Sequence, residues 1–220
     1  MQNRFPSDVA FTPAVKAMQA ARGSREIYAR MEEGRGWNRT VDDRLRAFLA
    51  KTRSAFLATA SADGQPTIQH RGGPEGFIKV LDDTTLGFAD YAGNRQYISM
   101  GNASENPKAQ LFLIDYVQRQ RIKIWGELEF VEDDPDLIAR VTPPEVAAHD
   151  SPARVERAAG FRVTAWDVNC PQHIPQRFDA EHVATALARR DARIAELERG
   201  LAVLQERLWL REGCAGAGDD

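Results

Sequence analysis

Short apolar runs separated by turn signals fill the middle of this 220-residue sequence and restrict it to a mainly antiparallel β-fold. The runs lie at residues 54–60, 66–70, 77–81, 85–90, 109–115 and 121–131. Between the first two, Asp63-Gly64 is a typical hairpin dipeptide. Six antiparallel strands in so short a stretch favour a barrel. A further apolar run at 160–168 predicts the strand with which the β-domain ends.

Helical patterns flank these strands. Thr12-Pro13 has the form of an N-cap followed by a first helical proline, and Gly23-Ser24 interrupts the apolar pattern beyond it, so two short helices are expected. Residues 41–49 carry the apolar stripe of an amphipathic helix that packs on a sheet. Further helices are predicted at 95–104, 135–140 and 144–148.

The C-terminal segment repeats leucine or isoleucine every seven residues, with leucines between them. The repeat positions are Leu187, Ile194, Leu201 and Leu208, and the intervening ones are Leu197 and Leu204. This spacing is typical of a short coiled coil. Gly200 and Arg190 weaken the seam. Two arrangements therefore stay open, self-association through this helix or packing of the helix on its own domain.

The patterns divide the sequence into four parts. We expect an N-terminal helical segment (1–40), a β-domain (41–179), an amphipathic or coiled-coil helix (180–212) and a flexible tail (213–220).

Composition excludes several classes of function. The 29 basic and 32 acidic residues leave a net charge of −3, which gives no field to attract nucleic acid or an acidic membrane. Cys170 and Cys214 lie far apart with no spaced ligand set, so neither a disulfide framework nor a metal site is expected. The sequence carries neither a signal-peptide pattern nor an apolar stretch of about 20 residues. A soluble, cytoplasmic protein is expected.

Isolated cations on the predicted strands suggest an anion site. They are Arg71, Lys79, Arg95 and Arg121. Gly93-Asn94-Arg95 precedes a predicted helix, where free N–H groups and the positive helix end suit a phosphate. A turn with a solvated arginine is the alternative. Lys79 interrupts an apolar strand, so its ammonium group reaches either solvent or an anion.

Two other segments could contribute to the same site. Arg71-Gly72-Gly73 would let a flat ligand approach the backbone, and the alternative is a bulge or wide turn. Arg121 and Lys123 share one face of a strand, which could equally be a solvated edge.

A rigid polar loop follows the last predicted strand, and such loops often line sites. It contains Cys170, Gln172 and His173. No oxyanion-donor motif accompanies the cysteine and histidine, so both are interpreted as lining or supporting a pocket rather than as a nucleophile and its base.

Several motifs together resemble the pyridoxamine 5'-phosphate oxidase-like FMN-binding split-barrel family. They are Phe56-Leu57-Ala58-Thr59, Asp63-Gly64, Gly93-Asn94-Arg95, Asn106-Pro107-Lys108, residues 121–126 and Arg177-Phe178. The resemblance covers residues 40–178. It extends to a bacterial branch with Arg-Gly-Gly-Pro and Asn-Cys-Pro-Gln-His-Ile-Pro motifs, which stand here at 71–74 and 169–175.

The resemblance implies a homodimer of six-stranded antiparallel split β-barrels with flanking helices and FMN at the subunit interface. The residues implied to bind FMN are Arg71, Gly72, Gly73, Phe77, Ile78, Lys79, Ala89, Asp90, Asn94, Arg95, Gln96, Arg121, Trp166, Gln172, His173 and Arg177. Lys79 and Arg95 match the lysine and arginine that hold the cofactor and its phosphate. Gln96 stands where the oxidase has a lysine, and Arg121 stands where it has a glutamine that contacts the flavin.

One departure bears on the substrate. The oxidase binds the phosphate of its vitamer with an Arg-x-His element, whereas this sequence reads His173-Ile174-Pro175. We therefore expect an FMN oxidoreductase that acts on another small molecule, with NAD(P)H as the candidate reductant. A non-catalytic flavin-binding or dimeric interaction module is the alternative, and haem in the same cleft, with an axial ligand such as His173, is a third possibility.

Overall fold

The computed structural model describes residues 4–147 and 153–215, with side chains up to residue 209. Its contacts divide the chain into two compact units, Met1–Ile174 and Pro175–Asp220. The side chain of Cys214, residue 148 of the predicted helix and residues 216–220 of the predicted tail lie outside this description.

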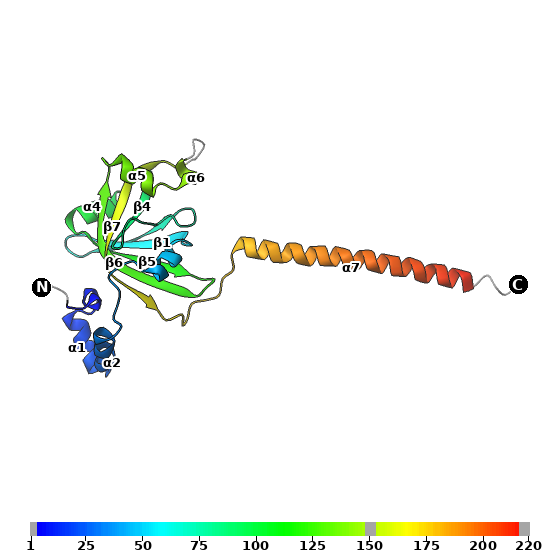
Figure 1. Ribbon diagram of the computed structural model, residues 1–220, viewed down its shortest axis with the longest axis horizontal. Helices are drawn as coiled ribbons and strands as arrows, with labels where there is room; N and C mark the ends of the chain where they lie inside the picture. The colour runs from blue at the N-terminus through cyan, green and yellow to red at the C-terminus, as the bar shows by residue number, and fades with distance from the viewer. Residues whose placement is uncertain (1–3, 148–152, 216–220) are drawn as a thin grey trace. The chain divides into compact units, whose positions relative to one another are not determined.

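Within the described residues, seven strands form one antiparallel sheet in the order β2-β1-β5-β6-β7-β4-β3 (Figure 1). They are β1 (Ser54–Ala60), β2 (Pro66–Gly72), β3 (Lys79–Val80), β4 (Thr85–Tyr91), β5 (Lys108–Asp115), β6 (Gln120–Val131) and β7 (Val155–Asn169). The mainly β-fold with flanking helices is confirmed. The expected number of six strands is wrong, because β7 pairs with β6 on one side and with β4 on the other.

The sheet bends around an apolar core. Alternate residues of β1, β5 and β6 point into it, including Leu57, Leu111 and Ile124, which are fully buried. A bulge at Trp125/Gly126 interrupts the pairing of β6 with β7. A Cβ atom on Gly126 would lie 2.3 Å from the carbonyl oxygen of Arg162, so only glycine fits this bend.

Side-chain caps begin several helices where the sequence predicts them. The helices of the first unit other than α4 are η1 (Pro6–Val9), α1 (Pro13–Ala21), α2 (Arg25–Glu33), α3 (Asp43–Leu49), α5 (Pro135–Val141) and α6 (Pro144–Ala147). Thr12 Oγ1 accepts a hydrogen bond from the Val15 amide at 3.3 Å, and Asp42 Oδ1 accepts one from the Leu45 amide at 2.9 Å. The caps satisfy amides that have no partner within their helix.

Helix α4 (Ile98–Glu105) begins later than the predicted residue 95. Arg95 and Tyr97 have φ values of 57° and 53°, so the chain twice enters the left-handed region before the helix starts. Helix α4 packs on β6 and β1, and Asn102 Nδ2 donates to Thr59 Oγ1 at 3.0 Å. This packing fixes the start of α4 against the sheet.

Strand β7 begins earlier than the predicted residue 160. Among its first five residues, Val155, Arg157, Ala158 and Ala159 pair with β4, and Ala158 and Ala159 also pair with β6. The five include Glu156, Arg157 and two alanines, which are good helix formers. Burial between two strands overrides that preference, since Ala158 and Ala159 are both fully buried.

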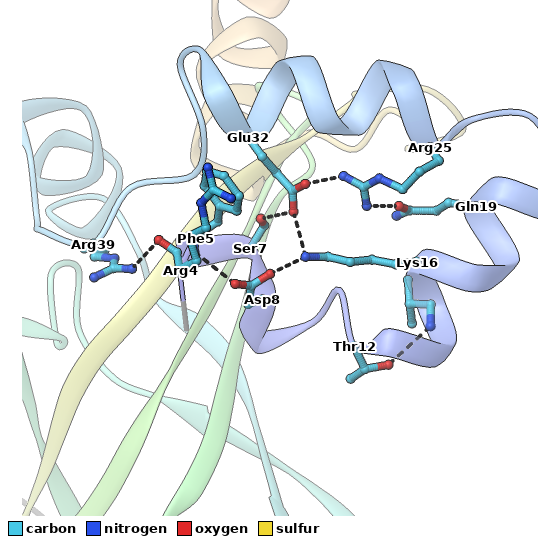
Figure 2. Close-up of polar contacts among 11 residues, drawn as sticks. Arg4, Phe5, Ser7, Asp8, Thr12, Lys16, Gln19, Arg25, Glu32 and Arg39 are labelled. Carbon is cyan, nitrogen blue, oxygen red and sulfur yellow. Dashed lines mark hydrogen bonds and ion pairs between the residues drawn. The ribbon is translucent and has the colours of Figure 1, made fainter. Parts of the chain in front are cut away.

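The N-terminal helices are held by aromatic rings and by a buried carboxylate. The ring of Trp37 stacks on that of Trp125 in β6 with centroids 4.7 Å apart, and Phe11 lies 5.1 Å from Trp37. Figure 2 shows Glu32 of α2 bonded to Ser7, Lys16 and Arg25. The two expected short helices are thus confirmed, and these ring and ion-pair contacts hold them to the neighbouring segments.

The second unit contains α7 (Ala180–Ala215), a helix of 36 residues. In the part of the chain that the structure describes, no helix combines the length and apolar character needed to cross a membrane.

Candidate functional site

An open pocket lies at the start of α4, beside β2 and β4. Its lining residues are Gln69, Arg71, Asp90, Tyr91, Gly93, Asn94, Arg95, Tyr97, Ile98, Ser99, Met100, Phe130, Glu156 and Arg157. Three of these side chains are guanidinium groups and two are carboxylates, which leaves one positive charge in excess. Such a lining favours an anionic ligand.

The charges in the pocket centre on Asp90. Its Oδ1 lies 3.0 Å from Nη1 of Arg71, and its Oδ2 lies 3.6 Å from Nε of Arg157. A bulge between Asp90 and Tyr91 shifts the pairing of β4 at this point. The carboxylate therefore lies between two arginines, which offsets the repulsion that it would otherwise exert on a bound anion.

Burial nevertheless dominates the ionisation of Asp90. Removal from water raises the pKa of its carboxyl above the ordinary value, and nearby Glu156 adds to that effect. Arg71 and Arg157 act in the opposite direction without cancelling it. Protonation of Asp90 is consequently easier here than on an exposed loop.

Two of the pocket's arginines retain unused donors. Among the described residues, neither Arg71 Nε nor Arg157 Nε has a hydrogen-bond partner, although both atoms are buried. The Arg157 side chain is only 6% exposed. A buried N–H without a partner costs free energy, so a ligand that accepts these hydrogen bonds would be stabilised.

The start of α4 supplies further donors. Helix amides in the first turn have no partner within the helix, and the side chain of Tyr97, the N-cap residue, provides no cap. Asn94 Oδ1 accepts from the Gln96 amide at 3.2 Å, which shapes the preceding turn. Ser99 Oγ donates to Gln69 Oε1 at 2.8 Å and ties the helix to β2.

The structure brings together four of the residues predicted for the site. Arg71, Asp90, Asn94 and Arg95 line the pocket. Lys79 does not line it; this lysine pairs with Gly87 at the edge of the sheet. The exposed Gln96 contributes its backbone to the turn but is not part of the lining.

Other predicted residues are engaged in the protein core. Phe77, Ile78 and Ala89 are at most 5% exposed. The buried Trp166 indole Nε1 donates to the Thr40 carbonyl at 2.7 Å. The side chains of these four residues thus have structural roles.

The two glycines after Arg71 are also explained by packing within the protein. A Cβ atom on Gly72 would lie 2.8 Å from the His70 ring, and one on Gly73 would lie 2.7 Å from Cβ of Phe77. Neighbouring side chains of the protein therefore lie close to the backbone at both glycines. Neither glycine lines the pocket.

A second group of polar residues lies at the start of β6 and the end of β7, at the ends of these strands that do not line the pocket. Register pairs Arg121 with Asn169 and Lys123 with Asp167. Within the described part of the chain, Arg121 Nε and Asn169 Oδ1 are buried without hydrogen-bond partners. Gln172 and His173 follow this end of β7, both exposed, and His173 has a φ of 65°.

Burial also raises the pKa of Asp167 in this second group. The Val168 amide and the positive charges of Lys123, Arg44 and Arg35 partly offset that rise. The group is thus another half-buried cluster in which cations outnumber acids.

The two groups are separated along the same strands. Phe130 of β6 lines the pocket, whereas Arg121 lies at the start of that strand, so about 30 Å of extended chain separates them. Arg177 belongs to the second unit and is described only there. One ligand molecule in the pocket would not span this length within a single copy of the chain.

Sequence reasoning missed several pocket residues. Arg157 is more buried than Arg71, Asp90 or Glu156, but its segment is composed of helix-forming residues, so no strand pattern marked it. Gln69 and Ser99 form a hydrogen bond between elements that are separated in sequence. The alternation of β2 could have placed Gln69 on the same face as Arg71.

Comparison with solved structures gives several distant likenesses. HupZ of Group A Streptococcus is 16% identical with a TM-score of 0.44, over 60% of this chain and 94% of that one. An FMN-binding protein from Syntrophomonas wolfei is 14% identical with a TM-score of 0.44, over 70% and 97% of the two chains. A Clostridium acetobutylicum protein related to general stress protein 26 is 14% identical with a TM-score of 0.41, over 63% and 93%.

Comparison with curated proteins gives no match. Because the TM-scores are low, the assignment of the family depends on a family model, described as pyridoxamine 5'-phosphate oxidase, which matches residues 41–168. That match spans more than half of the chain and includes all seven strands of the described structure except the last residue of β7, Asn169. The protein therefore belongs to the pyridoxamine 5'-phosphate oxidase family, whose members bind FMN on a split-barrel fold and are commonly dimeric.

Proposed function

We propose that this protein binds FMN in a homodimer and is an oxidoreductase acting on a small molecule other than pyridoxamine 5'-phosphate. The observation that carries the proposal is the pocket at the start of α4, where the buried Nε atoms of Arg71 and Arg157 have no hydrogen-bond partner in the described structure. The family supplies the identity of the anion, since its members bind FMN.

The donors in the pocket fit the phosphate of FMN. Arg71 and Arg95 would each donate to phosphate oxygens, together with the free amides of the first turn of α4. The positive charge of Arg157 would offset the negative charge of Asp90, which otherwise competes with the phosphate for Arg71. When bound, FMN would supply the hydride or electron transfer, and the chain would orient it and exclude water.

The second polar group would complete the site from the other subunit. Arg121, Gln172 and His173 are too far along β6 and β7 from the pocket of their own chain, as the strand separation indicates. In a two-fold dimer each chain can present one group to the other chain's pocket. Arg121 would then place a positive charge near the flavin ring.

The contributions of Lys79, Gln96, Trp166 and Arg177 to cofactor binding remain predictions. Lys79 is half-buried at the edge of the sheet, and among the described residues no acidic side chain pairs with its ammonium group. Its substitution by methionine, compared with that of Arg95, tests whether it reaches the cofactor.

Titration with FMN, followed by flavin fluorescence, tests the proposal. Wild-type protein is expected to bind FMN, and Arg95→Met is expected to weaken binding at least about tenfold through loss of a charge-assisted contact. Lys51→Met removes an exposed lysine that is not part of the pocket lining and should leave the affinity unchanged. A wild-type protein that does not bind added FMN would refute the flavoprotein assignment.

Anaerobic addition of NADH or NADPH to the FMN complex separates the two candidate activities. Bleaching of the flavin absorbance would support an oxidoreductase with a nicotinamide reductant. A complex that binds FMN but is reduced by neither cofactor would favour the alternative of a non-catalytic flavin-binding module. Pyridoxamine 5'-phosphate is expected not to be oxidised, because His173-Ile174-Pro175 replaces the family's Arg-x-His element.

A further inference from the structure

Helix α7 exposes a row of apolar side chains that only Arg190 interrupts. Val183, Leu187, Ile194, Leu197, Leu201, Leu204 and Leu208 are between 43% and 58% exposed. From Val183 to Leu208 the row extends about 40 Å along the helix. Apolar surface of this length is costly in water and is usually covered by a partner.

The spacing assigns this row to the seam of a heptad repeat. Leu187, Ile194, Leu201 and Leu208 occupy position a, and Val183, Leu197 and Leu204 occupy position d. With this register the flanking e positions include Asp191 and Glu198, and the flanking g positions include Arg193 and Arg207. Negative charge thus lies on one side of the seam and positive charge on the other.

This separation of charge selects one orientation for a second copy. In a parallel pair, a g residue faces the e residue five positions later on the other helix, so Arg193 would face Glu198. In an antiparallel pair, e faces e and g faces g, which would bring like charges together. Opposite charges across the seam favour the parallel pair.

The one charged seam residue also fits the parallel arrangement. Arg190 occupies a d position, and in a parallel pair a d residue is flanked by the e residue of the other helix. Asp191 of the second copy would therefore lie beside Arg190. A polar residue in the seam lowers stability but fixes the register of the two helices.

We propose that α7 forms a parallel, in-register, two-stranded coiled coil with α7 of a second copy of this chain. The charges of the e and g positions determine the orientation, and Arg190 with Asp191 determines the register. The proposal concerns the second unit and does not depend on the flavin site.

Cysteine cross-linking of the full-length chain tests the orientation. In a Cys170→Ser, Cys214→Ser background, Leu187→Cys and Leu208→Cys each place a thiol at one end of the seam. A parallel pair brings identical seam positions within disulfide distance, so each single variant should cross-link on mild oxidation. Arg199→Cys, at the outward f position, is the matched control and should cross-link at least roughly tenfold less.

Charge exchange tests the selection of the parallel form. In the Leu187→Cys variant, Arg193→Glu or Glu198→Arg alone should lower the cross-linking yield, and the two together should restore it. Cross-linking of Arg199→Cys as fast as Leu187→Cys would indicate random collision and overturn the proposal. So would cross-linking only in a mixture of Leu187→Cys with Leu208→Cys, which is the result for an antiparallel pair.

Discussion

Arg71 and Asp90 form an ion pair, with Nη1 3.0 Å from Oδ1, that joins the two ends of the sheet. Arg71 lies in β2, the first strand of the order, and Asp90 lies in β4, next to the last strand. Their side chains thus connect strands that share no ladder of backbone hydrogen bonds. Because the same two side chains line the pocket, this one contact both links distant strands of the sheet and forms part of the site.

Removal of the Arg71 charge should weaken both the ligand site and the fold. Arg71→Met is expected to raise the Kd for FMN at least about tenfold, because a charge-assisted donor is lost from the pocket. It should also lower the free energy of unfolding, since Asp90 keeps only Arg157 as a cationic neighbour. Fluorescence titration and urea denaturation measure the two effects. Lys51→Met is the control, and an unchanged Kd would show that Arg71 only supports the fold.

The raised pKa of Asp90 predicts a pH-dependent contribution to stability. A carboxyl whose folded-state pKa lies above its ordinary value of 3.8 contributes stability that is fully present below that value and lost as pH rises through the folded pKa. The free energy of unfolding of wild type, minus that of Asp90→Asn, should therefore fall as the pH is raised from about 3 to about 7.

Urea denaturation across that pH range measures this difference. Asp133→Asn changes an exposed aspartate outside the pocket lining and serves as the control. A difference that grows with pH would mean that Arg71 and Arg157 outweigh the burial of Asp90.

The sequence predicted the strands well, but it identified only part of the site. Arg71 and Arg95 were found because each stands beside turn glycines that mark the ends of elements. Lys79 was predicted because it interrupts an apolar strand, yet that strand lies at the sheet edge, and spacing along the chain does not indicate which strands surround a pocket. Arg157 was missed because residues 155–159 favour a helix locally and become a strand only through pairing with β4 and, at Ala158 and Ala159, with β6 as well.

The stacked pair of Trp37 and Trp125 is expected to hold the N-terminal helices on the sheet. Trp37→Ala should lower the free energy of unfolding by about 2 kcal/mol through lost packing and ring stacking. Urea denaturation measures the change. Trp209→Ala removes an indole that is 74% exposed and should change stability by less than about 0.5 kcal/mol. Equal effects of the two substitutions would argue against a specific role for the stacked rings.

Glu32 is expected to make the main polar contribution to holding the same N-terminal helices together (Figure 2). Its side chain is 3% exposed, accepts a 2.8 Å hydrogen bond from Ser7 and pairs with Lys16 and Arg25. Glu32→Gln should lower the free energy of unfolding by about 2 kcal/mol, because two cations lose their shared carboxylate. The neighbouring Glu33→Gln is exposed and should have little effect in the same denaturation assay. Similar values for both variants would contradict this role.

Mixing two inactive variants tests whether each FMN site is shared between subunits. Arg71→Met removes a donor from the pocket, and Arg121→Met removes the unpartnered guanidinium of the second polar group. If both groups meet at one interface, a mixed dimer of the two variants contains one doubly altered site and one intact site. Unfolding and refolding an equal mixture should therefore restore high-affinity FMN binding to about a quarter of all sites.

The outcome distinguishes a shared site from one built within a single chain. Each variant refolded alone should bind FMN weakly, and a mixture of Arg71→Met with Arg95→Met, both in the pocket, should restore nothing because no mixed dimer has an intact pocket. Recovery in the first mixture but not in the second would locate Arg121 in the neighbouring subunit's site. Full-affinity binding by Arg121→Met alone would instead show that the pocket at the start of α4 holds the cofactor without the second group.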